Sequence, residues 1–184
     1  IGDLSNLESL SMYYNIQLTT LPESIENLSS LKYLDSDHNN LTTLPESIGN
    51  LSSLEYLDLY NNQLTNIPES IGDLSSLEEL DLSDNQLTNI PESIGNLSSL
   101  ERLYLSDNQL TTVPESIGNL SSLESLWLMG NQITTLPESI CNLTIDWGGE
   151  SESGFDYFNI SNNQLCSSIP TCIVDYLGEQ DCGD

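Results

Sequence analysis

The stretch LEELDLSDNQLTNIPESIGNLSS, from Leu77 to Ser99, decides the fold, because it recurs with small changes along the whole chain. A copy that starts at Leu7 is one residue longer, and a degenerate copy starts near Phe155. The remaining copies follow one another every 23 residues and start at Leu31, Leu54, Leu100 and Leu123. A fixed period of this length, with leucines at fixed offsets, predicts a solenoid of stacked coils.

Each copy begins with a short extended segment. Leu80 and Leu82 point to one side of the expected strand, while Glu79 and Asp81 point to the other. Asn85 follows where the chain must turn, and its amide can satisfy backbone groups of its own coil and of the neighbouring coil. The equivalent residues of the other copies are Asn15, Asn39, Asn62, Asn108, Asn131 and Asn163. The sequence therefore predicts a ladder of asparagines along the solenoid.

The second half of each copy predicts a short helix. Pro91 and Glu92 suit its first turn, since proline has no amide hydrogen to leave unbonded and the acid faces the positive end of the helix. Ile94 and Leu97 then point to the core. All seven prolines occupy this one position, at Pro22, Pro45, Pro68, Pro91, Pro114, Pro137 and Pro170. One copy cannot bury its apolar side alone, so stacking must do so.

The pattern LxxLxLxxNxLxxLPxSIxxLxx resembles the 23-residue form of the leucine-rich repeat that is common in plant, algal, protist and bacterial repeat proteins. The resemblance covers essentially the whole chain. It implies an α/β solenoid, a curved right-handed coil with a parallel sheet on the concave face and short helical or 3-10 segments on the convex face. It also implies a binding module whose specificity lies in the variable concave positions.

We divide the chain into three parts. Residues 1–145 are the repeats, 146–154 are an inserted loop, and 155–184 are the degenerate last repeat with a C-terminal cap. The opening IGDLSNL matches Ile71–Leu77 without the second serine, so the chain starts inside a repeat and shows no N-terminal cap. We therefore expect a fragment, a processed chain, or a partner that covers this end.

The charge of the chain is strongly negative, with 29 acidic residues against Lys32 and Arg102. This balance argues against nucleic acid or an anionic membrane surface as the partner. No segment approaches the ~20 consecutive apolar residues of a membrane span. Three interpretations of the acidity remain open: a solvated coat that keeps a repetitive protein soluble, adaptation to salty or calcium-containing surroundings, and a groove for a cationic partner.

Four cysteines fall in the last part of the chain and predict a disulfide-tied cap in an oxidising compartment. Their spacing does not suggest a zinc site. Three pairings are open; Cys141 and Cys172 occupy neighbouring positions of successive coils, so we expect Cys141–Cys172 and Cys166–Cys182. Seven N-x-Ser/Thr sequons agree with an extracellular or cell-surface glycoprotein, although NLS is also the wording of the repeat: Asn27, Asn40, Asn50, Asn96, Asn119, Asn142 and Asn159.

The outward positions of the strands vary from copy to copy, whereas the convex positions hardly change. This variation indicates a face tuned for a ligand, in which exposed Tyr and Trp serve as anchors; drift on a face without a packing duty is the alternative. The candidate ligand-binding residues are Tyr33, Asp35, Asp37, Tyr56, Asp58, Tyr60, Glu79, Asp81, Arg102, Tyr104, Trp127, Met129 and Tyr157.

One column of this face consists of Asp35, Asp58 and Asp81, which should stack on adjacent strands ~4.8 Å apart. Like charges at this spacing repel, so the column should titrate upward, attract cations or face a basic partner. A calcium cage needs six to eight oxygens, so we expect no metal site and no cofactor, only a diffuse field with weak association of calcium or other cations.

Catalytic machinery is not evident. The single histidine, His38, is expected at the surface, and an open sheet face does not desolvate acid pairs as acid–base chemistry requires. The insert carries Trp147, which either packs under a cap-associated loop or belongs to a binding loop over the groove.

We expect no enzyme. We favour a recognition module for a protein, peptide or glycan, and a cationic partner is one option. The alternative is a structural, surface-coat or filament-forming protein that associates head to tail. Ice or mineral-surface binding is a variant of that alternative, supported by a partial ladder of threonine pairs: Thr19–Thr20, Thr42–Thr43, Thr111–Thr112 and Thr134–Thr135.

Overall fold

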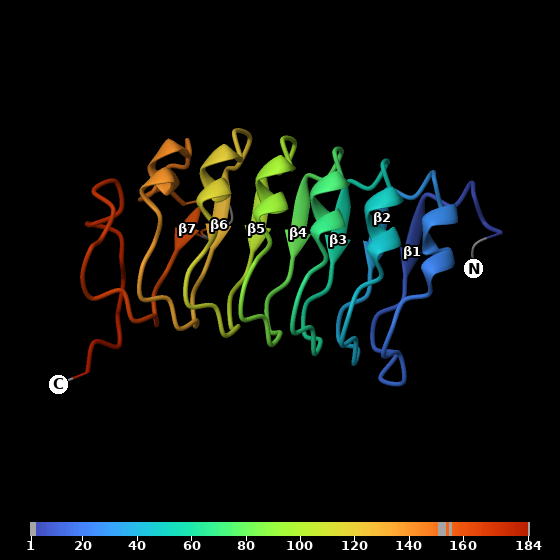
Figure 1. Ribbon diagram of the computed structural model, residues 1–184, viewed down its shortest axis with the longest axis horizontal. Helices are drawn as coiled ribbons and strands as arrows, with labels where there is room; N and C mark the ends of the chain where they lie inside the picture. The colour runs from blue at the N-terminus through green and yellow to red at the C-terminus, as the bar shows by residue number, and fades with distance from the viewer. Residues whose placement is uncertain (1–2, 151–153, 155, 184) are drawn as a thin grey trace.

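The computed structural model describes residues 3–150, 154 and 156–183. The chain forms a row of stacked coils in which seven parallel strands, in sequence order, build one sheet, with 3-10 helices on the opposite side (Figure 1). The strands are β1 (Ser9–Ser11), β2 (Tyr33–Asp35), β3 (Tyr56–Asp58), β4 (Glu79–Asp81), β5 (Arg102–Tyr104), β6 (Ser125–Trp127) and β7 (Phe158–Asn159). The helices are η1 (Glu23–Asn27), η2 (Glu46–Asn50), η3 (Glu69–Asp73), η4 (Glu92–Asn96), η5 (Glu115–Asn119) and η6 (Glu138–Asn142). The predicted solenoid is confirmed.

The strands are short because only their central residue must face the core. In β4, Leu80 is fully buried while Glu79 and Asp81 stay partly exposed on the outer side of the sheet, called the concave face below. The leucines of successive strands pair in register, as Leu80 does with Leu103. One continuous apolar core therefore runs through the stack between the sheet and the 3-10 helices.

The convex helices are short, as the Pro-Glu step predicts. Pro91 precedes η4 with φ of −67°, Ile94 is fully buried, and the amide of Leu97 closes the last turn on the carbonyl of Ile94. Neighbouring helices lie so close that a Cβ on Gly72 would overlap the backbone carbonyl of Ser93 in the next coil. A side chain at this position therefore interferes with the stacking of interior coils.

The predicted asparagine ladder is present at the corner after each strand. The Asn85 side chain donates to the carbonyls of Leu59 in the previous coil and of Leu82 in its own, at 3.0 and 3.1 Å. Its Oδ1 accepts the amide of Leu64 at 3.0 Å. The residue before it, Asp84, has φ of +56°, which turns the chain out of the strand. Each buried amide thereby joins two coils.

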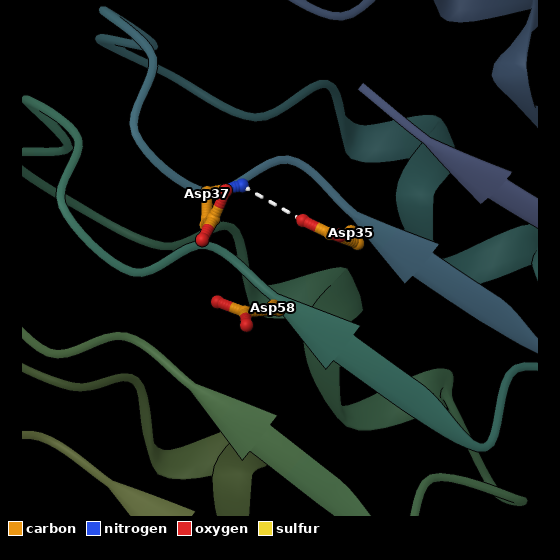
Figure 2. Close-up of side chains that lie close together, drawn as sticks. All are labelled: Asp35, Asp37 and Asp58. Carbon is orange, nitrogen blue, oxygen red and sulfur yellow. Dashed lines mark hydrogen bonds between the residues drawn. The ribbon is translucent and has the colours of Figure 1, made fainter. Parts of the chain in front are cut away.

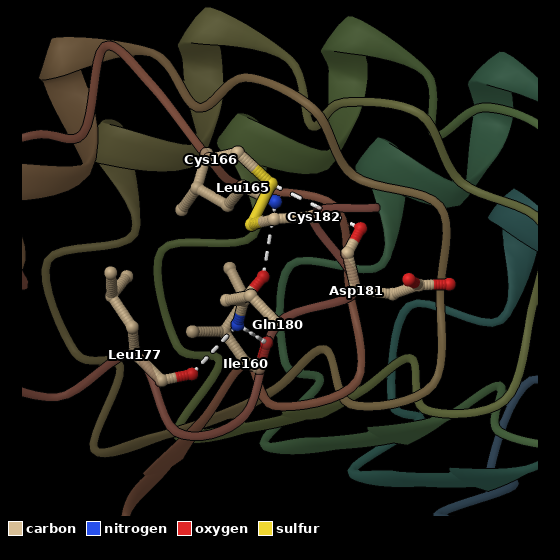
Figure 3. The surroundings of a disulfide bond; sticks show 7 residues. All are labelled: Ile160, Leu165, Cys166, Leu177, Gln180, Asp181 and Cys182. Carbon is tan, nitrogen blue, oxygen red and sulfur yellow. Dashed lines mark hydrogen bonds between the residues drawn. A yellow bond between two sulfur atoms is a disulfide. The ribbon is translucent and has the colours of Figure 1, made fainter. Parts of the chain in front are cut away.

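The C-terminal cap continues this ladder with a residue that the sequence analysis did not single out. Gln180 donates to the carbonyl of Ile160 and accepts the amide of Leu165, at 2.9 and 3.0 Å (Figure 3). Asn85 makes the equivalent bonds to Leu59 and Leu64 of the previous coil. Gln180 therefore takes the place of the corner asparagine that would follow Asn163.

Two disulfides hold this cap, and their pairing is the one expected. Cys166–Cys182 lies beside Gln180 (Figure 3), and Cys141–Cys172 joins the last helical turn to the cap. Cys141 stands at the position that glycine occupies in the interior coils. No free cysteine remains among the residues described.

The inserted loop lies partly outside the described residues, since 151–153 are not among them, nor is Phe155 at the start of the last repeat. Glu150 of the loop forms an antiparallel bridge with Asp156 just after it, and the amide of Tyr157 donates to the carbonyl of Gly149 at 3.1 Å. In the part of the chain that the structure covers, no helix has the length and apolarity needed to cross a membrane.

Candidate functional site

The concave face carries the candidate ligand-binding residues on its strands or shortly after them, except Tyr157, which directly precedes β7. The register places Asp35 opposite Asp58 and Asp58 opposite Asp81, as expected. The next pairs in the same column are Asp81 with Tyr104 and Tyr104 with Trp127. The column therefore changes from carboxylates on β2–β4 to aromatic rings on β5 and β6.

The third outward column is less open than the strand alternation predicts. Tyr60 and Met129 are partly exposed, but Ser83 and Ser106 are buried. The strands end before this column, and the chain is already turning toward the asparagine corner there. A small side chain at the turn is consequently covered by its larger neighbours.

The N-terminal half of the face contains a stacked tyrosine pair beside the acids. The rings of Tyr33 and Tyr56 lie 4.5 Å apart and nearly parallel. The hydroxyl of Tyr56 donates to Asp58 at 3.1 Å. Burial, with the nearby charge of Asp58, raises the pKa of Tyr56 well above the ordinary tyrosine value. Tyr56 therefore stays a hydrogen-bond donor at any physiological pH.

Three carboxylates come together at this half of the face, from Asp35, Asp37 and Asp58 (Figure 2). One oxygen of each lies within 4.8 Å of the others, and the amide of Asp37 donates to Asp35 at 3.2 Å. Burial first, and then the charges of Asp37 and Asp35, raise the pKa of Asp58. Three carboxylates are fewer ligands than calcium requires, so weak cation association stays a prediction.

His38 does not lie at the open surface as expected. Its ring stacks on Tyr14 at a centroid distance of 4.4 Å and meets the edge of Tyr60 at 5.1 Å. Its Nδ1 lies 3.1 Å from Asp37. The side chain is about three-quarters buried. The prediction missed this packing because Tyr14 belongs to the irregular first copy, whose extra residue obscured the alignment.

The C-terminal half of the face is hollowed. A cavity of about 580 Å³ opens over β4–β6, and its described lining includes Tyr60, Asp81, Tyr104, Trp127, Met129 and Tyr157. Arg102 also lines it, but its guanidinium is bound to Glu79 at 2.6 Å and to Glu101 at 3.2 Å. The hydrogen bond to Glu79 raises the pKa of Arg102, so the guanidinium stays charged beside these two carboxylates.

The insert contributes to the core. Trp147 is half-buried and meets Phe158 edge to face at 4.8 Å, as the packing interpretation of this loop expects. Just after the insert, the carbonyl of Asp156 accepts the indole N–H of Trp127 at 2.8 Å. Asp156 and Tyr157 line the hollow, but none of the described residues of 146–154 is part of its lining, so the binding-loop interpretation stays a prediction.

Chemically, the hollow combines aromatic rings with carboxylates on a rigid sheet. Burial raises the pKa of Asp81 to about 6, although the amide and hydroxyl of Ser83 bond to it and oppose this effect. Such a surface can bind and orient a ligand with apolar and cationic parts. Pockets of this volume accommodate small ligands or single side chains with part of their backbone.

Comparison with protein families agrees with the observed geometry. Residues 46–145 match the family model described as "Leucine-rich repeat region", and residues 30–51 match the model described as "Leucine Rich Repeat". A search of curated protein sequences finds no match to the chain.

Solved structures share the solenoid. A leucine-rich repeat protein of Leptospira interrogans is 41% identical, with a TM-score of 0.74 over 78% of this chain and 37% of that one. The plant peptide hormone receptor RGFR1, solved in complex with RGF2, is 33% identical, with a TM-score of 0.73 over 89% of this chain and 26% of that one.

A third similar structure is the ectodomain of the membrane receptor kinase GASSHO1/SCHENGEN3 from Arabidopsis thaliana, in complex with CASPARIAN STRIP INTEGRITY FACTOR 2. It is 30% identical, with a TM-score of 0.70 over 88% of this chain and 23% of that one. The chain thus spans 23% to 37% of the length of these three proteins.

Proposed function

Since the chain belongs to the leucine-rich repeat family, typically a non-enzymatic interaction scaffold, we propose that it recognises a peptide or an extended protein segment through its concave face. The observation that carries this proposal is the hollow over β4–β6, where Tyr104 and Trp127 lie side by side on adjacent strands. Partly exposed aromatic side chains on a rigid scaffold are the residues that most often dominate binding energy.

The similar plant receptor RGFR1 was solved with RGF2, and this supports a peptide as the partner. A glycan stays a prediction that no observation on this surface favours over a peptide. The test is selection of displayed random peptides on the disulfide-intact protein, followed by binding of the selected peptides to two variants.

Tyr104→Ala/Trp127→Ala removes the two adjacent aromatic rings of the hollow, and Thr111→Ala/Thr112→Ala is the matched control at exposed positions outside the concave strands. Selected peptides should lose at least about tenfold in affinity for the first variant, because each buried aromatic anchor contributes about 2 kcal/mol or more. Equal binding to both variants, or no selectable peptide, would contradict the proposal.

We also propose an extracellular setting. Two disulfides support it, because they persist in oxidising compartments. Five sequon asparagines end the 3-10 helices and are exposed: Asn27, Asn50, Asn96, Asn119 and Asn142. In contrast, Asn40 and Asn159 are partly buried; Asn40 donates to the carbonyl of Ile16 at 2.7 Å, and Asn159 accepts from Ser161. Among the five exposed residues, Asn50 donates to Glu26 at 2.8 Å. Peptide mass spectrometry of the natively produced protein should find glycans at the five exposed sites.

A second candidate function, self-association, is favoured by the first coil. Leu4, Tyr13, Tyr14 and Ile16 are each more than half exposed there, and Val174 in the cap at the other end is also more than half exposed. Light scattering over a range of concentrations separates the two candidates. Long assemblies that form as concentration rises would support head-to-tail stacking, and a monodisperse monomer would leave peptide recognition as the function.

A further inference from the structure

The described lining of the hollow over β4–β6 is unusual in combining aromatic rings with several carboxylates. The rings of Tyr104 and Trp127 lie 4.9 Å apart and are tilted by 59° to each other. Tyr60 lines the hollow from the N-terminal side, and Tyr157 lines it from the last coil. The faces of such rings carry negative charge density and attract cations that approach within ~6 Å.

The indole of Trp127 is held in one place. Its N–H donates to the backbone carbonyl of Asp156 at 2.8 Å, which connects the segment just after the insert to β6. A ring that is fixed before the ligand arrives loses little conformational entropy on binding. Trp127 can therefore act as a preformed wall of the hollow.

The charges of the hollow are unbalanced. Four of the described lining residues are acidic, namely Asp81, Asp107, Glu124 and Asp156, and the one basic residue among them is Arg102. Arg102 forms ion pairs with Glu79 and Glu101, which are not lining residues of the hollow. Its positive charge therefore does not neutralise the four acids that line the hollow. The hollow therefore presents a net negative surface.

Asp81 is the acid best placed to meet a ligand above the rings. It lies directly opposite Tyr104 in the strand register, and Tyr104 lies opposite Trp127. Adjacent strands are ~4.8 Å apart, so one cation can contact the carboxylate and an aromatic face together. Burial raises the pKa of Asp81 to about 6, and Asp58 and Glu79 add to this effect. A cation bound beside Asp81 would offset the free-energy cost of keeping this carboxylate charged where it is partly buried.

We propose that this hollow receives a single basic side chain, arginine or lysine, from the bound peptide, with its charge on Asp81 and its stem against Tyr104, Trp127 and Met129. This inference rests on the proposed peptide-binding function and assigns its specificity. An acidic side chain fits less well, because it would have to displace Glu79 or Glu101 from Arg102 and enter a chain with 29 acids and two bases.

A positional-scanning library of acetylated, amidated hexapeptides tests the proposal on the disulfide-intact protein. The expected result is enrichment of arginine or lysine at one position. The best arginine peptide is then compared with its citrulline analogue, which is nearly isosteric but neutral. The analogue should bind at least about tenfold more weakly, since a hydrogen bond to a charged group is worth about 1.5–3 kcal/mol.

Asp81→Asn removes the carboxylate charge and should reduce the arginine–citrulline difference to less than about threefold. The matched control is Asp175→Asn, which makes the same chemical change at an exposed position of the C-terminal cap, outside the hollow. It should leave the difference unchanged. Such a comparison of two changes isolates the energy of the pair.

Three other results would contradict the proposed basic-side-chain site or the proposed function. Selected peptides that need Trp127 but show no basic preference, or prefer an acidic residue, would overturn this inference and leave the proposed function standing. Equal sensitivity of the arginine–citrulline difference to Asp81→Asn and Asp175→Asn would also overturn it. Absence of any peptide that depends on Tyr104 and Trp127 would overturn both proposals.

Discussion

Two columns of polar residues run along this solenoid, and they show opposite uses of the same stacking. The corner column consists of asparagines that are buried from Asn39 onward, and each of these buried amides bonds to its own coil and to the neighbouring coil, as Asn85 does. The concave column begins with Asp35, Asp58 and Asp81, whose like charges are placed opposite one another by the same register.

The difference lies in the chemistry of the side chain. An amide has donors and acceptors and can satisfy a stack of identical neighbours, whereas an ionised carboxylate only accepts hydrogen bonds. Repetition therefore stabilises the corner and leaves the concave column with unbalanced charge. We infer that the corner column holds the fold together and that the concave column remains available for a ligand.

The largest effect should follow from breaking the corner column. Asn85→Ala leaves several buried backbone groups without a partner, and we expect the free energy of unfolding to fall by about 3–5 kcal/mol. Denaturant unfolding followed by tryptophan fluorescence measures it. Asn89→Ala, at an exposed convex position, is the control and should change stability by less than about 0.5 kcal/mol. A similar loss in both variants would refute the structural role of the ladder.

The next effect concerns the last rung of that column. Gln180→Ala removes the bonds to Ile160, Leu165 and Leu177 and should lower the unfolding free energy by about 2–3 kcal/mol. Thermal unfolding with both disulfides intact is the measurement. Gln164→Ala changes an exposed glutamine and serves as the control. If the cap tolerated both changes equally, the disulfides alone would close the solenoid.

The column of aspartates on the concave face should behave in the opposite way, since removal of one of its charges should raise the free energy of unfolding. Because the pKa of Asp81 in the folded chain is about 6, against an ordinary value of 3.8, the folded state binds more protons than the unfolded state between these pH values. The contribution of Asp81 to the unfolding free energy therefore rises as pH falls from about 7 to about 4.

Asp81→Asn tests this directly. It should stabilise the protein by roughly 1–2 kcal/mol at pH 7 and have little effect near pH 4, because the buried charge is absent in both cases. The midpoint of thermal unfolding, measured across this pH range for the two proteins, provides the comparison. A variant that is less stable than the parent at pH 7 would show that the charge of Asp81 supports the fold.

The smallest effect concerns cations at the acidic end of the concave column. If the carboxylates of Asp35, Asp37 and Asp58 form only a diffuse field, calcium and magnesium should raise the unfolding midpoint to the same small extent, about one degree. Sodium chloride at equal ionic strength is the control. A calcium-specific rise of several degrees would instead indicate a coordinated site.

The sequence by itself determined the features that repeat. The spacing of Leu80, Asn85 and Pro91 predicted the strand, the corner and the start of the convex 3-10 helix, because each depends on neighbours within one period. The stacking of the aspartates also followed, since a constant period brings equivalent residues together. For the same reason the candidate residues of the concave face could be named before the structure was known.

Only the tertiary structure decided the features that break the period. Gln180 reaches the position of a corner asparagine by a path that no repeat describes, and the packing of His38 depends on the irregular first coil. One side of the hollow is closed by Asp156 and Tyr157, which the chain places beside Trp127 after the insert. The residues in these contacts are not separated by a multiple of the repeat length. The repeat pattern in the sequence therefore could not predict that they meet in the folded chain.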